Sequence, residues 1–311
     1  MRYGIFVSLA LAFTFFSCKN DDDSGVVEVP PSLLSEVSPE DDAKIKEFLN
    51  THFYNYEDFE TQPEGFDQKI IIDTIAGENA DKTPMRAYAD SLTINVSSSF
   101  LGLSAGEENV PHKLYYITVR QGGGESPTFA DSTLVRYQGS LLDGTTFDEN
   151  QDFTWFEISR IGARGFADGI AQLNAGTTDQ IIENGDGTYD IANSGMGIII
   201  MPSGLGYFHA PPSSIPRYAP LIFKIDLGLF VEDTDLDNDG VPSIDEDLNG
   251  NGFLYDDNTD GDTSANFRDI DDDGDGIPTR NEITDDNGVI ILPYPDADND
   301  GVPDYLDPDT R

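Results

Sequence analysis

The sequence predicts an α+β fold: an antiparallel sheet wrapped on a short helix, preceded by a helical and strand extension and followed by an irregular acidic tail. Strand-like apolar runs recur between residues 114 and 229, and one segment with helical spacing lies among them. After Val231 the apolar periodicity fades and Asp-rich repeats begin. The expected parts are a signal peptide (1–18), a tether (19–37), an N-terminal extension (38–111), a central domain (112–232) and acidic repeats (233–311).

Charge restricts the classes of partner. The 311 residues include 59 acidic and 17 basic side chains, a net charge of -42, which disfavours nucleic acids and anionic membrane surfaces. Residues 232–311 hold 26 of the acids, with three arginines and no lysine. Such an excess is typical of a solvated, disordered segment or of one that binds divalent cations.

The first residues resemble a bacterial lipoprotein signal. Arg2 precedes an apolar run over residues 3–16, which is short for a membrane span, and Ser17 and Cys18 follow. Cys18 is the only cysteine, so no intramolecular disulfide can form, and its place resembles an acylation site; the alternative is a free cysteine in an ordinary signal peptide. Residues 19–23 resemble the acidic surface-export tag of Bacteroidetes lipoproteins. We therefore expect a lipid-anchored protein of the outer membrane or cell surface.

The extension is expected to begin with a helix. Ser38 is placed as its N-cap, with Pro39 in the first turn and an acid three residues after the cap. The apolar stripe of this helix is Ile45, Phe48 and Leu49. Residues 70–72 are expected to form a strand, whereas residues 81–110 give no assignable pattern.

The central domain is expected to hold five strands and one helix. The strands are predicted at residues 114–119, 133–138, 153–158, 197–201 and 221–229. A turn is expected at Asp143 and Gly144. Phe166, Ile170 and Leu173 share one helical face, and Gly176 is expected to stop that helix. Residues 177–194 contain a hairpin turn signal at 184–187.

Five motifs in this domain, in order, resemble those of FKBP-type prolyl isomerases over residues 112–232. Residues 135–139 read V-x-Y-x-G, and residues 143–148 read D-G-x-x-F-D. Residues 166–176 match the helix and its stop. Residues 201–207 resemble the I-P-x-x-L-x-Y segment, and residues 215–223, with one residue more, resemble the closing I-P-x-x-x-L-x-F segment. The resemblance implies a peptidyl-prolyl cis-trans isomerase that acts on proline-containing segments of exported proteins, with no cofactor for catalysis.

The resemblance also implies which side chains form the proline pocket. The walls would be Tyr137, Phe147, Phe153 or Trp155, and Phe223, with Phe166 as the floor, Asp148 and Tyr207 as polar groups, and Ile215 near the mouth. An apolar pocket suits the chemistry, because stripping water from an X-Pro amide favours its twisted, less polar form over the planar one.

Some residues depart from the family pattern. Gly162 and Ala163 stand where the family has bulkier residues, and no arginine follows Asp148 before Phe153. His209 is expected to be an exposed loop residue near the rim. A pocket that binds proline segments without turnover is therefore an alternative hypothesis.

The tail contains three loops whose spacing fits calcium ligation. Alternate carboxylates, a glycine at position six, a carbonyl at position seven and an acid at position twelve are what a Ca²⁺ loop needs. The expected ligands are Asp235, Asp237, Asp239, Val241 and Glu246; Asp271, Asp273, Asp275, Ile277 and Glu282; and Asp296, Asp298, Asp300, Val302 and Asp307. Two degenerate copies begin at Asp247 and Asp256.

This arrangement resembles thrombospondin type 3 repeats, in which calcium replaces a hydrophobic core. The resemblance implies structural Ca²⁺ and a tail that is ordered only with metal bound. The remaining hypothesis is that the protein serves as a calcium-dependent adhesion or spacer protein, with the central domain as scaffold.

Overall fold

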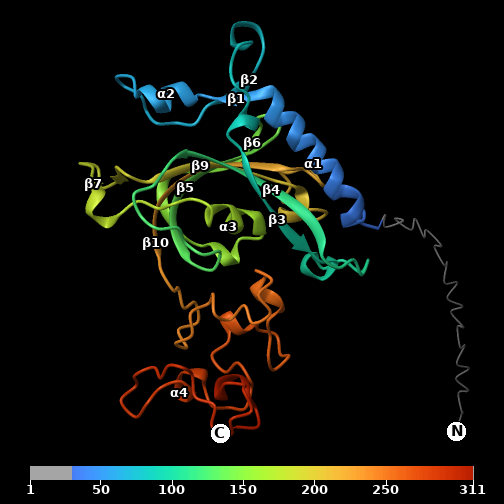
Figure 1. Ribbon diagram of the computed structural model, residues 1–311, viewed down its shortest axis with the longest axis vertical. Helices are drawn as coiled ribbons and strands as arrows, with labels where there is room; N and C mark the ends of the chain where they lie inside the picture. The colour runs from blue at the N-terminus through green and yellow to red at the C-terminus, as the bar shows by residue number, and fades with distance from the viewer. Residues whose placement is uncertain (1–29, 311) are drawn as a thin grey trace, which may run out of the picture. The chain divides into compact units, whose positions relative to one another are not determined.

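A six-stranded antiparallel sheet organises residues 30–310, the part of the chain that the computed structural model describes (Figure 1). Its strands, in spatial order, are β3 (Asp90–Val96), β4 (Val110–Arg120), β9 (Gly195–Met201), β10 (Leu221–Val231), β5 (Ser132–Leu141) and β6 (Thr146–Glu157). The other elements are α1 (Leu34–Thr51), β1 (His52–Tyr54), α2 (Tyr56–Thr61), β2 (Ile72–Thr74), α3 (Arg164–Ile170), β7 (Ile181–Glu183), β8 (Tyr189–Ile191) and α4 (Thr279–Glu282). The prediction of a mixed fold with an antiparallel sheet and few helices is confirmed.

The predicted signal peptide and Cys18 lie outside the described residues. From Ser32 onward the chain forms one compact unit. Across residues 30–310, none of the helices combines the length and the apolar character that crossing a bilayer requires.

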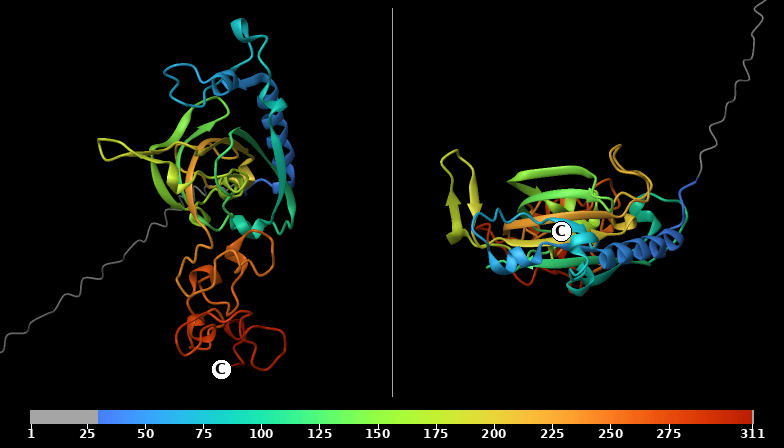
Figure 2. Two further views of the ribbon diagram at one scale, coloured as in Figure 1. Left: turned by 60° about the vertical axis from the view of Figure 1, so that its left-hand side comes forward. Right: turned by 90° about the horizontal axis from the view of Figure 1, so that it is seen from above.

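Both faces of the sheet are covered. Every residue of β9 is buried: Ile199 and Met201 join the core around α3, whereas Ile198 and Ile200 join the core under α1. This alternation is the period-two pattern of a strand with an apolar layer on each side. Figure 1 shows β5, β9 and β10 around α3, and Figure 2 shows α1 lying along the sheet.

Helix α3 packs closely on the sheet. Phe166, Ile170 and Leu173 are buried, as their spacing predicted. A Cβ on Gly169 would lie 2.6 Å from Ile199, so glycine permits this close approach. The helix ends at Ile170, before the predicted stop at Gly176, because the next amides bond to carbonyls three residues earlier, as in a 3₁₀ turn. The Gly176 amide donates to the Gly228 carbonyl of β10 (2.6 Å).

Helix α1 begins earlier than the sequence indicates. Its first residue is Leu34, not a residue after Ser38, and Pro39 lies inside it. The free amides of Leu34 and Ser35 donate to the two carboxylate oxygens of Glu107 (2.7 and 3.1 Å), which caps the helix from a distant part of the chain. Ser38 is buried, and its hydroxyl donates to the Pro111 carbonyl (2.7 Å). The predicted stripe of Ile45, Phe48 and Leu49 is buried against the sheet.

The extension contributes a strand to the sheet. Strand β3, from the segment without an assignable pattern, pairs along its whole length with β4, and the expected boundary at residue 112 falls inside β4. The strand expected at residues 70–72 is β2, shifted to Ile72–Thr74, and it pairs with β1. Beyond the sheet, the turn expected within residues 177–194 is confirmed as the β7–β8 hairpin.

The tail after β10 is built mainly of turns. Its apolar residues form two small clusters. One holds Leu254, Ala265 and Phe267 of the tail together with Ala130, which precedes β5. The other holds Val241, Ile283 and Tyr305. The irregular structure that the sequence predicted is therefore combined with limited apolar packing.

Candidate functional site

Four aromatic rings from four elements meet on the α3 side of the sheet. Tyr137 (β5), Phe147 (β6), Phe166 (α3) and Phe223 (β10) form what we call the aromatic cluster, in which centroid distances are 5.8 Å for Tyr137–Phe166, 5.0 Å for Phe166–Phe223 and 5.6 Å for Phe147–Phe223. Phe166 and Phe223 are buried, whereas Tyr137 and Phe147 are only partly covered. The sheet and helix thus present an apolar surface with a buried floor.

Gly139 makes room for this cluster. A Cβ at this position would lie 2.6 Å from the Phe147 ring and 3.0 Å from Phe223. The V-x-Y-x-G spacing therefore has a steric reason, since any side chain at its last position would displace the rings.

The expectation that Phe153 or Trp155 forms a wall is wrong. The Phe153 ring stacks on Tyr189 of the β7–β8 hairpin (centroids 6.1 Å apart), with the Arg136 guanidinium 4.6 Å from its centroid. Trp155 is 49% exposed. Because successive strand residues face opposite sides, Phe156 turns inward and lies 5.7 Å from Tyr137, a contact that the sequence analysis missed.

Two polar groups lie at the edge of the aromatic cluster. The Tyr137 hydroxyl donates to Asp148 (2.7 Å), an exposed side chain. Burial, and then the charge of Asp148, raise the pKa of Tyr207, so its hydroxyl stays protonated at neutral pH. The Tyr207 ring would lie 3.6 Å from a Cβ on Gly162, which places the predicted loose wall beside this tyrosine.

The loop that carries Tyr207 is held from both ends. Before it, the buried carboxylate of Asp41 in α1 accepts hydrogen bonds from the amide (2.9 Å) and hydroxyl (2.5 Å) of Ser203. After it, Phe208 is buried and packs edge-on against Tyr218 (4.9 Å). The extension therefore positions a predicted site residue.

Ile215, expected near the mouth of the pocket, and His209, expected to be exposed, are both less exposed than predicted. Ile215 is 6% exposed and belongs to the core around α3. His209 is half-buried, with its Nδ1 atom buried and unpartnered among the described residues, rather than exposed.

Arg164, the first residue of α3, joins the central domain to the tail. Its guanidinium lies 5.8 Å from the ring centroid of Phe100 and 5.7 Å from that of Phe253, and it donates to the Asn251 carbonyl (2.8 Å). It also pairs with Asp168 (3.3 Å), whose pKa burial raises to about 6 against the opposing effect of Arg164. Phe100, Arg164, Asp168 and Phe253 line a cavity of about 410 Å³, and no member of the aromatic cluster lines it.

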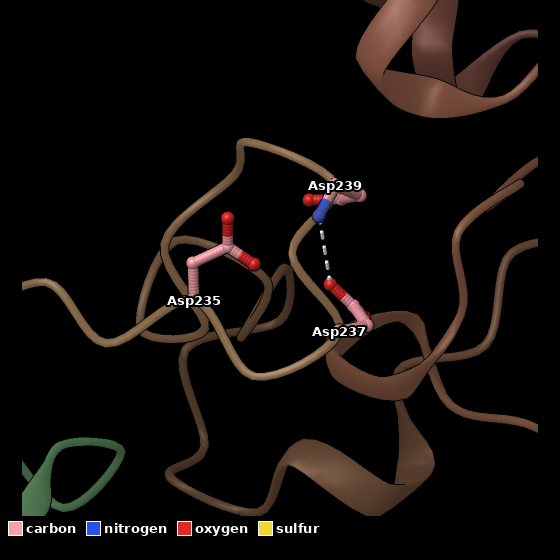
Figure 3. A group of neighbouring side chains, drawn as sticks. All are labelled: Asp235, Asp237 and Asp239. Carbon is pink, nitrogen blue, oxygen red and sulfur yellow. Dashed lines mark hydrogen bonds between the residues drawn. The ribbon is translucent and has the colours of Figure 1, made fainter.

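In the tail, the alternate aspartates of all three predicted loops converge. One oxygen from each of Asp235, Asp237 and Asp239 lies within 4.8 Å of the others (Figure 3). The same holds for the triplets Asp271, Asp273 and Asp275, and Asp296, Asp298 and Asp300. The glycines at position six have left-handed φ values of 108°, 92° and 100° in Gly240, Gly276 and Gly301, which explains why glycine stands there.

The residues at position seven are also placed in a regular way. The amides of Val241, Ile277 and Val302 each donate to the aspartate two residues earlier, at 2.8, 2.7 and 2.8 Å. These hydrogen bonds use the backbone amides of the position-seven residues and not their carbonyl groups.

The position-twelve residues differ among the three loops. Both carboxylate oxygens of Glu246 and of Glu282 are buried and unpartnered among the described residues. Burial, followed by nearby aspartates, raises the pKa of Glu246 to about 11 and that of Glu282 to about 8. Asp307 instead accepts from the Asp309 amide (3.1 Å) and the Thr310 hydroxyl (2.7 Å), so both of its oxygens have a hydrogen-bond partner.

The sequence analysis missed two further acidic groups. Asp260, Asp262 and Asp269 converge in a mostly exposed cluster. Asp272 lies with Asp239 and Glu246, and all three are buried. Neither group follows from the loop spacing, because Asp269 lies between two loops and Asp272 belongs to a different loop from Asp239 and Glu246.

Residues 236–295 match a family model described as BamM C-terminal. The chain is 25% identical over 177 residues to a probable FKBP-type 25 kDa peptidyl-prolyl cis-trans isomerase of Pseudomonas aeruginosa, covering 56% of this chain and 66% of that protein. It is 28% identical over 114 residues to the FKBP-type peptidyl-prolyl cis-trans isomerase FkpA of Escherichia coli K12, covering 37% of this chain and 36% of that protein. It therefore spans just under two thirds of the first relative and about one third of the second.

Among solved structures, FkpA from Escherichia coli is matched with a TM-score of 0.33 and 20% identity, over 63% of this chain and 62% of that one. A peptidyl-prolyl cis-trans isomerase from Pseudomonas syringae is matched with a TM-score of 0.31 and 21% identity, over 38% of this chain and 76% of that one. The sequence matches to the curated relatives, at 25% and 28% identity, show distant homology to FKBP-type peptidyl-prolyl cis-trans isomerases.

Proposed function

We propose that this protein is a peptidyl-prolyl cis-trans isomerase that assists the folding of exported proteins, with a tail that binds calcium. The observation that carries the proposal is the aromatic cluster of Tyr137, Phe147, Phe166 and Phe223, beside the hydroxyl of Tyr207. Its substrates would be proline-containing segments of exported proteins, and catalysis would need no cofactor.

The proposed mechanism uses binding alone. The proline ring would rest against the aromatic cluster, whose partly covered members are Tyr137 and Phe147, and the rings would exclude water from the X-Pro amide. The barrier to rotation is about 18–20 kcal/mol, and it falls when resonance in the amide is reduced. Desolvation disfavours the polar planar amide relative to the twisted one. The Tyr207 hydroxyl, which donates to no described residue, would donate to a substrate carbonyl.

The proposal includes a location. Cys18 and the apolar run before it support a lipid anchor, and the acidic residues after it support the outer membrane or the cell surface. The net charge of -42 disfavours nucleic acid as a further partner.

Calcium is the cation that the tail residues fit. The convergent oxygens are all carboxylates, and several of those buried, such as Asp237 Oδ2 and Asp271 Oδ1, have no hydrogen-bond partner among the described residues. Buried, unpartnered carboxylates of like charge are unfavourable unless they are protonated or a cation lies between them. A flexible set of oxygen ligands suits Ca²⁺ better than Mg²⁺, which requires a smaller octahedral shell.

A second candidate is a non-catalytic module that binds proline segments. Gly162 favours it, since this residue leaves the wall beside Tyr207 without a side chain. Under a third reading, the calcium-binding tail carries the function as an adhesion or spacer element.

An isomerisation assay on the full chain separates these readings. The wild type should accelerate exchange of an X-Pro peptide, and Phe147→Leu should lower kcat/KM by about tenfold, which is the loss of roughly 1.4 kcal/mol of ring contact. Phe59→Leu is the matched control, because Phe59 pairs with Phe66 in the extension. Peptide binding without acceleration by the folded protein would support the binding module instead.

A further inference from the structure

We infer that Asp239, Glu246 and Asp272 hold a divalent cation that joins two loops of the tail. One carboxylate oxygen from each residue lies within 4.8 Å of the other two. Asp239 and Glu246 belong to the loop that begins at Asp235, whereas Asp272 is the second residue of the loop that begins at Asp271. The loop pattern assigns no ligand to that second position. The inference rests on the proposed binding of calcium by the tail, and it adds a site between repeats that shares Asp239 and Glu246 with the site of the first loop.

The three side chains are buried, and each has at least one carboxylate oxygen without a hydrogen-bond partner among the described residues. Asp239, Glu246 and Asp272 are 2%, 1% and 1% exposed. Both oxygens of Glu246, Oδ2 of Asp239 and Oδ1 of Asp272 have no hydrogen-bond partner in the described part of the chain. The second oxygen of each aspartate is used locally: Asp239 Oδ1 accepts from the Val241 amide (2.8 Å), and Asp272 Oδ2 accepts from the Thr279 hydroxyl (3.1 Å). Each aspartate is thus oriented by one oxygen and offers the other.

No side chain of the described residues neutralises this group by an ion pair. Arg280 is the nearby cation, but its guanidinium donates to the Asn238 carbonyl (3.0 Å), and none of the salt bridges among residues 30–310 involves the three carboxylates. Buried carboxylates can remain charged together only when a counter-charge lies among them. Two oxygens on opposite sides of a Ca²⁺ ion, each about 2.4 Å from it, are about 4.8 Å apart. Because the three oxygens lie no farther apart than this, one such ion can contact all three.

The position of Asp272 is fixed by the later loop. Its amide donates to the Thr279 hydroxyl (3.2 Å), which in turn donates to the Asp272 carboxylate. Thr279 is fully buried and is the first residue of α4, which ends at Glu282. A cation bound to Asp272 would thereby tie the loop of residues 235–246 to the loop of residues 271–282. Since both loops must be ordered to complete this site, calcium binding to the two loops should be cooperative.

The test compares Asp272→Asn with Asp286→Asn in the full chain. Asparagine keeps the size and an acceptor for Thr279 but removes the charge, and Asp286 is an exposed aspartate outside every convergent acidic group of the described residues. Bound Ca²⁺ is counted by native mass spectrometry, and affinity is measured by calorimetric titration of chelator-treated protein with calcium chloride. We expect Asp272→Asn to bind one ion fewer than the wild type and to need at least tenfold more calcium for cooperative binding, whereas Asp286→Asn should match the wild type.

The outcomes separate this inference from the proposed function. A wild type that binds no calcium would refute both the bridging site and the proposed calcium-binding tail. A wild type that binds calcium, together with an Asp272→Asn variant that has the same ion count and titration curve, would overturn the bridging site and leave the rest of the tail proposal standing. If Asp272→Asn is poorly folded, Thr279→Val and Thr279→Ser replace it. Thr279→Val, which lacks the hydroxyl, should weaken cooperative calcium binding, and Thr279→Ser should restore it. Equal calcium binding by the two variants would count against the site.

Discussion

Replacing Gly139 by alanine should disturb the aromatic cluster more than it disturbs the fold. The new methyl group would lie 2.6 and 2.7 Å from two atoms of the Phe147 ring and 3.0 Å from Phe223, where normal carbon contacts are about 3.5–4.0 Å. The Phe147 ring must therefore move by about 1 Å. Phe147 is partly exposed and can turn toward solvent, so the displacement should open the proposed proline site.

The size of the effect follows from two opposing contributions. Overpacking costs about 1–3 kcal/mol, and replacing glycine by alanine in a strand returns about 0.5–1 kcal/mol. The net loss of unfolding free energy should be about 0.5–2 kcal/mol. Because kcat/KM depends on the ring positions, we expect it to fall by about tenfold, which corresponds to about 1.4 kcal/mol in the transition state.

Stability is measured by urea unfolding, with the fluorescence of Trp155, the only tryptophan, as probe, and activity by exchange of an X-Pro peptide. Gly185→Ala is the matched control, because nothing lies within 4 Å of its Cβ. Combining Gly139→Ala with Phe147→Leu should recover stability, giving a coupling of about 1 kcal/mol, without recovering activity. Unchanged activity in Gly139→Ala, with the clash evident in its stability, would refute the assignment of Phe147 to the site.

Four further outcomes are expected. Cys18→Ala should move the protein from the membrane fraction to the soluble fraction after cell lysis; retention with the signal removed would contradict lipid anchoring. Arg164→Ala should destabilise the protein by about 3 kcal/mol in urea unfolding, since it leaves Asp168 buried without its partner, whereas Arg160→Ala, from an exposed pair, should cost less than about 0.5 kcal/mol. Burial lowers the pKa of His112 below its unfolded value of about 6.5, so the unfolded protein binds more protons than the folded protein as the pH falls below about 6.5. The free energy of unfolding should therefore fall with pH in this range, and His112→Leu should make the melting temperature less dependent on pH between pH 7 and 5. Small-angle scattering of the full chain should show smaller dimensions in millimolar calcium than in chelator, with magnesium a poor substitute, and equal dimensions would contradict calcium ordering.

Local patterns predicted the centre of the fold well. The apolar runs of β4, β9 and β10 and the helical spacing of Phe166, Ile170 and Leu173 correspond to buried surfaces, because period and burial are directly coupled in strands and helices. The turn signal at residues 184–187 also gave the right hairpin, since the positive φ of Gly187 (91°) is a local backbone requirement that glycine meets.

Long-range contacts account for what the sequence did not predict. The start of α1 depends on Glu107, which lies 73 residues from Leu34 in the chain. Phe156, and not Phe153 or Trp155, contacts Tyr137 because alternate residues of β6 face opposite sides of the sheet, and the run of aromatic residues does not show which alternate set faces inward. The loop spacing could not predict that Asp272 lies beside Asp239 and Glu246, since these two residues come from another repeat.

The cover that α1 provides on the outer face of the sheet has a consequence for how this protein can be divided. A fragment limited to residues 112–232 would lose β3 and would expose Tyr115, Ile117, Ile198, Ile200 and Ile222 to water. Contiguous apolar surface of that kind promotes self-association. Expression boundaries should therefore begin near Ser32, because the extension and the central sheet share one apolar core and form a single compact unit.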